Sequence, residues 1–360
     1  MPKGLIKAAS EPDEVRAPLP GFDINITVHQ RARYASSIAV LQLDRMALMS
    51  AEDNVARTAR LHLPEGLMAI SVLPGATAAI LGGGAEFTPD KVNQHCAGRQ
   101  YYQTVFAPTL TSAIFIPPEQ LRQAAATLNV SLPNIDTNNL MKPSTARLHR
   151  LMRLHTAAMT IVRETPHIID HGEAMRGLEH AVLGAVLACM ENSDAQSTRP
   201  SVLRHGAVVR AFDDMLAADP ESNILVSDVC ARLRISPRML RYCCERQMGL
   251  SPKRFLLLRR MHLVRRRLID APPGSITVTD AATAYGFWEL GRFAGAYRSL
   301  FGETPSATLR RNQGMAPGPA GDPILLRPGW LTGGASADWA EAGSRLLSGT
   351  MPAASTTSRE

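Results

Sequence analysis

One segment of the chain occurs twice, and this repeat limits the fold more than any other feature of the sequence. The stretch from Cys230 to Pro252 and the stretch from Ala282 to Pro305 share a small first residue, an apolar residue five positions later, and a final Gly-x-x-Pro. Matching positions lie 52 residues apart before the turn and 53 apart after it, so one residue is inserted at the turn. The repeat therefore predicts one supersecondary unit that forms twice.

Each copy has the pattern of a short helix, a tight turn and a second helix. Cys230 and Ala282 are small, as a close crossing of the two helices requires. Gly286 stands where the turn calls for a positive φ, which glycine adopts without penalty, whereas the first copy has Arg234 at the matching position. The pattern predicts two helix-turn-helix units.

The apolar positions of the repeat are predicted to form the core of this region. Phe293, Tyr297 and Phe301 recur every four residues and therefore share one helix face, which favours a core ladder over a cofactor site or a stacking platform. Leu240 is predicted to pack the second helix of the first copy onto its first helix in the same way. The full predicted core and turn set is Leu240, Gly249, Pro252, Gly286, Phe287, Phe293, Tyr297, Phe301, Gly302 and Pro305.

The residues between the copies predict a connecting helix from 252 to 269, about 27 Å long at 1.5 Å per residue. Two units on such a rod could enter successive major grooves, about 34 Å apart, on one face of DNA. Five arginines surround the rod, and we expect some to reach phosphates and some to hold the two halves together: Arg259, Arg260, Arg265, Arg266 and Arg267.

The positive charge of the chain is concentrated in this region. Residues 204–311 hold 18 Lys and Arg against 10 Asp and Glu, whereas the rest of the chain holds 21 against 22. The surplus favours a polyanionic partner. On charge alone, a solvated basic face is an equally good interpretation.

Residues 205–311 resemble the C-terminal domain of the AraC/XylS family of transcription regulators, in which a helix joins two helix-turn-helix motifs. The first half matches at Ser236, Leu240, Gly249, Ser251, Pro252, Phe255, Leu256, Arg260, Met261, Arg265 and Leu268. The second half matches at Gly286, Phe287, Phe293, Tyr297, Phe301, Gly302, Pro305 and Arg310. The resemblance implies a transcription regulator that binds double-stranded promoter DNA. It also implies RNA polymerase as the partner of an activator, while repression stays open.

The family's DNA-contacting positions can be carried over to this sequence. In the first motif the base-reading positions fall on Arg238, Arg241 and Tyr242; the alternative is that these arginines meet phosphates alone. In the second motif they fall on Leu290, Gly291 and Gly295, which offer base edges no side-chain hydrogen bonds. We therefore expect the first motif to read sequence and the second mostly to position the protein. The expected positioning contacts come from Ser236, Arg259, Arg266, Thr279, Arg292 and Arg298.

The N-terminal part reads differently. Residues 22–135 have short apolar runs broken by Gly and Pro clusters, which predict a β-sandwich or barrel. Residues 144–191 predict two amphipathic helices that pack on the β-structure or form a dimer contact. This part resembles, more weakly, the barrel or cupin-like sensor domains of the same family, and its helices resemble the ethanolamine-regulator-like branch. The resemblance implies a small-molecule effector and a homodimer. The expected fold class is α+β multidomain, with a sensor and dimerisation domain at 22–191.

The remaining boundaries follow from composition. Residues 1–21 are expected to be flexible, residues 192–203 to be a linker before the DNA-binding domain at 204–311, and residues 312–360 to be a disordered tail. The chain has no apolar run of about 18 residues and no signal-peptide pattern, so we expect a cytoplasmic protein with no membrane partner. The five cysteines lack a disulfide or C-x-x-C spacing.

The alternative function is an enzyme or a protein-binding domain fused to a DNA-binding module. His167 and His171 are four apart and could share a helix face, and His95 lies next to Cys96 without a visible catalytic partner. The segment GGGAEF (82–87) is best interpreted as a turn between strands. We expect no catalytic residues, metal or cofactor. The histidines of the β-rich part are isolated and lack the His-x-His spacing of metal-binding cupins: His29, His62 and His95.

Overall fold

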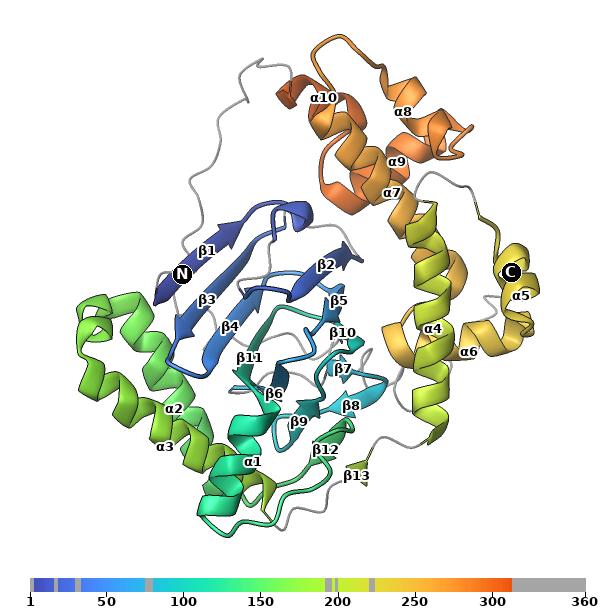
Figure 1. The fold of residues 1–360 in the computed structure, drawn as a ribbon. Coiled ribbons are helices and arrows are strands. Elements are labelled where there is room, and N and C mark those ends of the chain that lie inside the picture. The colour runs from blue at the N-terminus through green and yellow to red at the C-terminus, as the bar shows by residue number, and fades with distance from the viewer. Residues whose placement is uncertain are drawn as a thin grey trace, which may run out of the picture. The chain divides into compact units, whose positions relative to one another are not determined.

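The computed structural model describes residues 3–15, 19–29, 34–74, 80–191, 196–197, 200–219 and 224–312. Its N-terminal part contains two antiparallel sheets (Figure 1), which confirms the predicted β-rich domain. The larger sheet has the order β1 (Gly4–Ala9), β3 (Ser36–Gln42), β4 (Ala47–Asp53), β11 (Thr109–Ile116), β6 (Met68–Val72), β9 (Val92–His95), β12 (Asn139–Met141) and β13 (Gln196–Ser197). The smaller sheet has the order β2 (Asp23–Val28), β5 (Arg57–His62), β10 (Gln100–Val105), β7 (Ile80–Gly82) and β8 (Ala85–Phe87).

The two sheets enclose an apolar layer. Ile38, Met49 and Phe115 of the larger sheet belong to one buried cluster with Ile26 and Leu61 of the smaller sheet. Side chains alternate between the two faces of a strand, so every second residue of β5 and β10 is directed into this layer. The others face away from it.

Three helices cover the other face of the larger sheet: α1 (Pro118–Thr127), α2 (Thr145–Glu164) and α3 (Gly172–Met190). Leu148, Leu151 and Met159, which share one predicted helix face, are all buried in the cluster between these helices and the sheet. Of the two alternatives, the structure thus shows the helix pair packed on the β-domain. The short 3-10 helices are η1 (Pro12–Glu14) and η2 (Pro166–Asp170).

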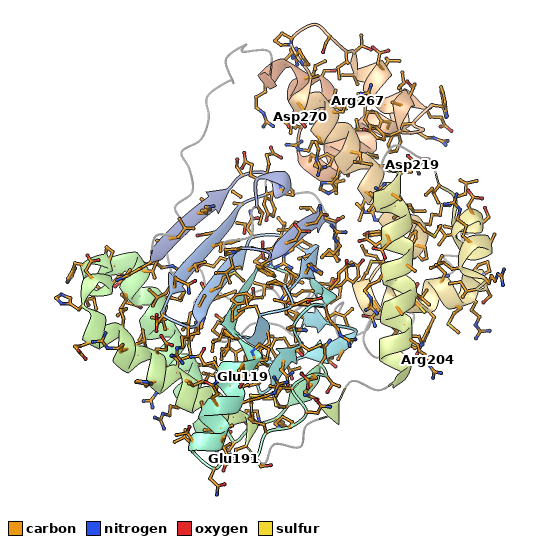
Figure 2. The ribbon with its side chains drawn as sticks, in the orientation of Figure 1. Glu119, Glu191, Arg204, Asp219, Arg267 and Asp270 are labelled. Carbon is orange, nitrogen blue, oxygen red and sulfur yellow. The ribbon has the colours of Figure 1, made fainter. Side chains whose placement is uncertain are left out.

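The C-terminal part is helical, as predicted. It contains α4 (Pro200–Ala218), α5 (Val226–Leu233), α6 (Pro237–Met248), α7 (Pro252–Asp270), α8 (Val278–Ala284), α9 (Leu290–Phe301) and α10 (Pro305–Asn312). Figure 2 shows Arg204 and Asp219 near opposite ends of α4, and Arg267 and Asp270 near the end of α7.

Three boundary predictions need correction. Residues 4–9, expected to be flexible, form β1, because the segment pairs along its whole length with β3. The helix α4 begins at Pro200, inside the expected linker, since proline is well placed at the start of a helix. Helix α1 follows β11 within the range expected to be β-structure. The predicted tail, apart from Asn312, lies outside the described residues. None of the helices described is long and apolar enough to span a membrane.

Candidate nucleic-acid interface and sensor pocket

The two copies of the repeat have the same local structure. In the first, the backbone N–H of Ile235 donates to Cys230 O at 3.1 Å, and in the second Phe287 N–H donates to Ala282 O at 3.0 Å. Gly286 has φ 77°, as predicted, and Arg234 adopts the left-handed region at φ 53° in spite of its side chain. Both turns therefore close in the same way, as two helix-turn-helix units.

The helix ends are also equivalent. Gly249 and Gly302 end α6 and α9 in the left-handed conformation, at φ 67° and 78°. Ser236 caps α6, its hydroxyl accepting a hydrogen bond from Met239 N–H at 3.1 Å. Thr277 and Asp280 form a capping box at the start of α8. These residues fix where α6 and α8 begin and where α6 and α9 end, whereas α9 begins without a side-chain cap.

Of the predicted core set, Leu240, Phe293 and Tyr297 are buried, whereas Gly302 is exposed at the end of its helix. Leu240 is fully buried and Phe293 is 3% exposed. The ring centroids of Phe293 and Tyr297 are 5.6 Å apart and those of Tyr297 and Phe301 are 4.6 Å apart. The Tyr297 hydroxyl also meets Thr308 Oγ1 at 2.9 Å. The side chains of Phe293, Tyr297 and Phe301 therefore pack against one another inside the domain.

Two arginines of α7 make contacts inside the helical domain. Arg265 is 5% exposed and holds Glu11 at 2.6 Å and Glu303 at 2.9 Å. Burial alone would lower the pKa of Arg265, but hydrogen bonding and attraction to Glu11, Tyr297 and Glu303 raise it above its ordinary value. The Arg260 guanidinium lies 5.3 Å from the centre of the Phe287 ring. These two arginines hold the domain together.

Two positioning residues on α7 behave differently. Arg266 is exposed, as a phosphate contact requires. The Arg259 guanidinium instead donates to Leu216 O, at the end of α4, and burial lowers its pKa. For Arg259 the structure therefore gives an internal role in place of the expected phosphate contact, because its side chain bridges two helices.

The expected base-reading face of α6 is exposed. Arg238 is exposed, and Arg241 pairs through Nε with Glu245 Oε1 at 2.7 Å. The hydrogen bond to Glu245 raises the pKa of Arg241. Tyr242 is 45% exposed, with its ring edge-on to His205 at 5.0 Å between centroids. A base contact by Arg241 would have to replace or share this surface ion pair.

The face of α9 that corresponds to the base-reading face of α6 has few large side chains. Gly291 and Gly295 are exposed, and a Cβ added at either would meet no heavy atom within 4 Å. Arg292 is 85% exposed and pairs with Glu289 at 2.9 Å, and Arg298 is also exposed. Thr279, Arg292 and Arg298 stay predicted as backbone contacts.

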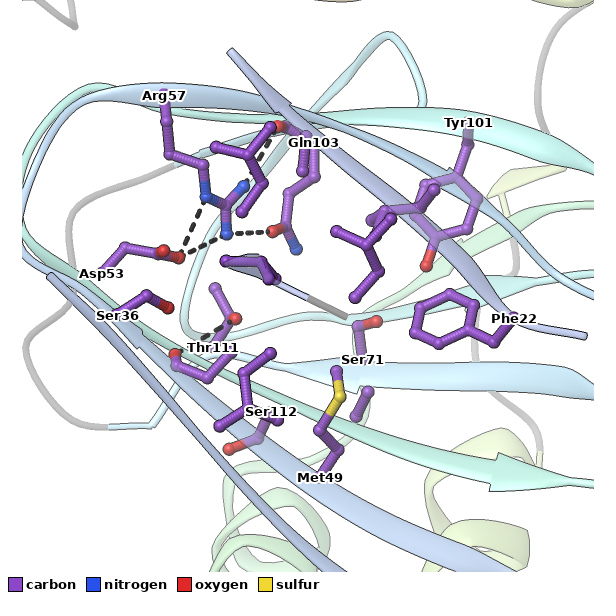
Figure 3. A pocket seen from close by; sticks show the side chains of 18 of the residues that line it. Phe22, Ser36, Met49, Asp53, Arg57, Ser71, Tyr101, Gln103, Thr111 and Ser112 are labelled. Atoms are coloured by element: carbon purple, nitrogen blue, oxygen red, sulfur yellow. Dashed lines mark hydrogen bonds and ion pairs between the residues drawn. The ribbon is translucent and has the colours of Figure 1, made fainter. Parts of the chain in front are cut away.

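A cavity of about 40 Å³ lies between the two sheets (Figure 3). Its polar end is the buried ion pair of Arg57 and Asp53, whose shortest N–O distance is 2.6 Å. Arg57 also donates to Gln103 Oε1 at 3.0 Å. The wall is otherwise apolar or carries hydroxyls, and includes Phe22, Met49, Tyr101, Ser36, Ser112 and Phe115.

The cavity residues were not singled out from the sequence. A usable signal was present, however: Arg57 alternates with Ala59 and Leu61 on an otherwise apolar strand face. An inward charge on such a face has to be paired, and Asp53 is four residues away.

The outer face of the smaller sheet contacts the helix-turn-helix region. Thr104 Oγ1 and Thr58 Oγ1 donate to Met248 O, at the end of α6, at 2.8 and 3.2 Å. Arg60 pairs with Asp213 of α4 at 2.8 Å. Tyr102 joins the buried cluster of the first helix-turn-helix unit. Because Arg57 and Gln103 alternate with these residues, β5 and β10 contact the cavity on one face and the helices on the other.

A second group of contacts involves α7. Val28 N–H donates to His262 Nε2 at 3.2 Å, and Arg254 donates to His29 O at 3.1 Å. Glu11, near the start of the chain, accepts two hydrogen bonds from Arg265, at 2.6 and 2.8 Å. Glu11 was not predicted, since nothing in its local sequence identifies a partner 254 residues away.

The two histidine sites considered from the sequence, at His95 beside Cys96 and at His167 with His171, do not have the geometry of a catalytic or metal site. His95 stacks on Tyr101 with 3.7 Å between centroids, and burial lowers its pKa to about 3. Burial raises the pKa of the neighbouring Cys96 thiol, which disfavours a nucleophilic thiolate. His167 and His171 are exposed and lie in and after η2, not on one α-helix face as considered from the sequence.

One further feature of this region agrees with the sequence. Within the segment 82–87, Gly83 and Gly84 form the predicted turn, which joins β7 to β8. In the described part of the chain, no three His, Cys, Asp or Glu side chains gather as metal ligands would.

Comparisons with known proteins agree with the repeat. Residues 229–311 match the family model of a helix-turn-helix domain. The chain is 31% identical over 160 residues to a probable thc operon regulatory protein of Rhodococcus erythropolis, covering 42% of this chain and 48% of that protein. It is 44% identical over 106 residues to XylDLEGF operon transcriptional activator 3 of Pseudomonas putida, covering 29% and 31%. The matches thus span about half or less of these curated relatives.

Solved structures show a looser likeness. The AraC-like transcriptional activator CuxR is 14% identical, with a TM-score of 0.36, over 72% of this chain and 91% of that one. ToxT from Vibrio cholerae is 11% identical, with a TM-score of 0.26, over 81% and 98%. Residues 229–311 therefore form a helix-turn-helix domain that is similar in sequence to part of the XylDLEGF operon transcriptional activators.

Proposed function

We propose that this chain is a sequence-specific, DNA-binding transcription regulator controlled by a small-molecule effector. The observation that carries the proposal is the pair of equivalent helix-turn-helix units, each with an exposed second-helix face, in the part of the chain that holds the positive charge. Promoter DNA is the matching polyanion. The protein would act in the cytoplasm, where that DNA is.

In this proposal α6 reads bases and α9 completes the docking. Arg238 and Arg241 lie on the exposed face of α6, where a guanidinium can donate two hydrogen bonds to O6 and N7 of guanine. Arg266, Arg292 and Arg298 would meet phosphates, and Ser236 would meet the backbone beside the helix that it caps. Each phosphate neutralised makes binding more sensitive to salt.

The cavity between the sheets is the proposed effector site. Its 40 Å³ is small beside the roughly 150 Å³ that holds benzene in an apolar protein cavity. An effector larger than a few atoms would therefore have to move side chains or separate the sheets. Because β5 and β10 also hold α4 and α6, that movement would change the contacts of the DNA-binding domain.

This coupling gives the effector a way to act. It shifts the equilibrium between two arrangements of the DNA-binding domain by as much as its affinity for them differs. The segment 192–203, which precedes most of α4, would accommodate the change. An unchanged DNA affinity and footprint at saturating effector would contradict the mechanism.

We also propose a homodimer and a contact with RNA polymerase. The outward face of α2 carries Met152, Ala157 and Ile161 along a groove, which suits a second copy of the same helix. The polymerase contact follows from the relatives, which are named as activators. Light scattering of the wild type and of Ala157→Arg tests the dimer, and an unchanged mass for the variant would contradict this face.

The function itself is tested by selecting genomic fragments with the purified protein at one stated salt concentration. We expect enrichment of a defined motif, and loss of that enrichment in Arg238→Ala/Arg241→Ala. A control variant, Arg150→Ala, changes an arginine of α2 that lies outside the proposed interface and should leave the selection unchanged. Equal recovery of all fragments by wild type and variants would contradict sequence-specific binding.

A further inference from the structure

An exposed tryptophan stands at the entrance to the second helix of the second unit. Trp288 is 76% exposed, and Leu290, the first residue of α9, is 37% exposed. The core does not use Trp288, because Phe287 and Phe293 fill the space beneath the turn with ring centroids 4.9 Å apart. A large apolar side chain in this position therefore needs an explanation outside the fold.

The same helix face is otherwise bare. Gly291 and Gly295 lie in α9 and are exposed, although glycine in a helix interior costs about 1 kcal/mol relative to alanine. A Cβ at either position would meet nothing within 4 Å, so the packing of the domain does not demand glycine there. What these glycines allow is the close approach of another surface to the helix backbone.

We propose, on the basis of the DNA-binding function proposed above, that α9 reads thymine through the C5 methyl group. The first residues of a recognition helix are those that reach base edges in the major groove. Leu290 has no hydrogen-bonding group, and Trp288 has only its indole N–H, so most of the surface that they expose is apolar. The thymine methyl is the apolar group that the major groove presents. The bare glycine face lets the helix enter deeply enough for contact.

Charge on α9 favours DNA as the occupant of this surface. Arg292 is 85% exposed and Arg298 is exposed, so cations lie on the same helix as the apolar pair. This combination suits a groove in which methyl groups lie between two rows of phosphates. The second unit would thus contribute sequence preference by apolar contact, in addition to the positioning expected of it.

The test uses the site that wild-type protein selects and replaces each thymine of its second half by deoxyuridine, which lacks the methyl. Burying one methyl contributes about 0.8 kcal/mol, so each contacted thymine should lose about fourfold in affinity on replacement. In Trp288→Ala or Leu290→Ala, affinity for thymine DNA should fall and the uracil penalty should shrink towards onefold. The control Leu128→Ala changes an apolar residue of the sensor part that is 59% exposed, and it should keep the full penalty.

The outcomes separate this inference from the function on which it rests. Wild-type binding with no uracil penalty in the second half would overturn thymine reading and leave DNA binding intact. A normal penalty in both α9 variants, with loss of transcription alone, would assign Trp288 to a protein partner and also overturn it. Failure of wild type to select any site would instead contradict the proposed function.

Discussion

The ion pair between Glu11 and Arg265 joins the start of the chain to the centre of the DNA-binding domain. Arg265 is 6% exposed and Glu11 17% exposed in their side chains, and two hydrogen bonds of 2.8 and 2.6 Å link them. Removing one partner of a buried ion pair costs about 3–5 kcal/mol. Because Glu303 stays 2.9 Å from Arg265, we expect Glu11→Ala to lower the free energy of unfolding by about 2 kcal/mol.

Urea unfolding of the full chain, followed by circular dichroism, measures this effect. Glu11→Gln keeps the shape and one acceptor, so its loss should be smaller than that of Glu11→Ala. The control Glu173→Ala breaks a surface pair whose carboxylate is 91% exposed, and should change stability by less than about 1 kcal/mol. Equal effects of Glu11→Ala and Glu173→Ala would refute the reasoning that this pair is a buried tether.

Three other predictions concern single sites. Arg234→Gly should raise the free energy of unfolding by about 1 kcal/mol and Gly286→Ala should lower it by a similar amount in urea titrations, because both positions have positive φ. Burial lowers the pKa of His155 to about 4, so the unfolded state binds more protons below pH 6.5 and stability should fall by up to about 3 kcal/mol between pH 6.5 and 4. His155→Gln should remove this contribution to the slope, measured by urea unfolding at several pH values, and leave that of His95, whose pKa burial also lowers; exposed His62→Gln should leave the slope unchanged. Arg241→Ala should relax base preference at one position by about 1–3 kcal/mol in competition binding, whereas uniform weakening across sequences would assign it to phosphate.

The repeat predicted the helical region well because its constraints are local. A positive φ at Gly286 and a four-residue aromatic spacing from Phe293 to Phe301 depend on residues close in sequence. The amphipathic face of residues 148–159 predicted its own burial in the same way. Local patterns of this kind also marked the β-rich part, where turn residues separate short apolar runs.

Contacts between distant segments were beyond the sequence. Glu11 lies in a Pro-rich stretch that was predicted to be flexible. The pairing of the preceding strand β1 and the contact of Glu11 with Arg265 both depend on tertiary structure. The internal role of Arg259 was missed for the same reason, since a basic helix does not reveal which side faces α4. The cavity depends on the register of β5 against β10, which brings Arg57 and Gln103 to one end of it.

Missing-base interference on the selected site tests the central claim most directly, because it maps where each helix-turn-helix unit touches DNA. The account predicts two blocks of interference on one DNA face, about one helical turn apart. Guanines should dominate the block read by α6, and thymines the block that meets α9. A single block, or two blocks on opposite faces of the DNA, would contradict the assignment of both units to DNA reading.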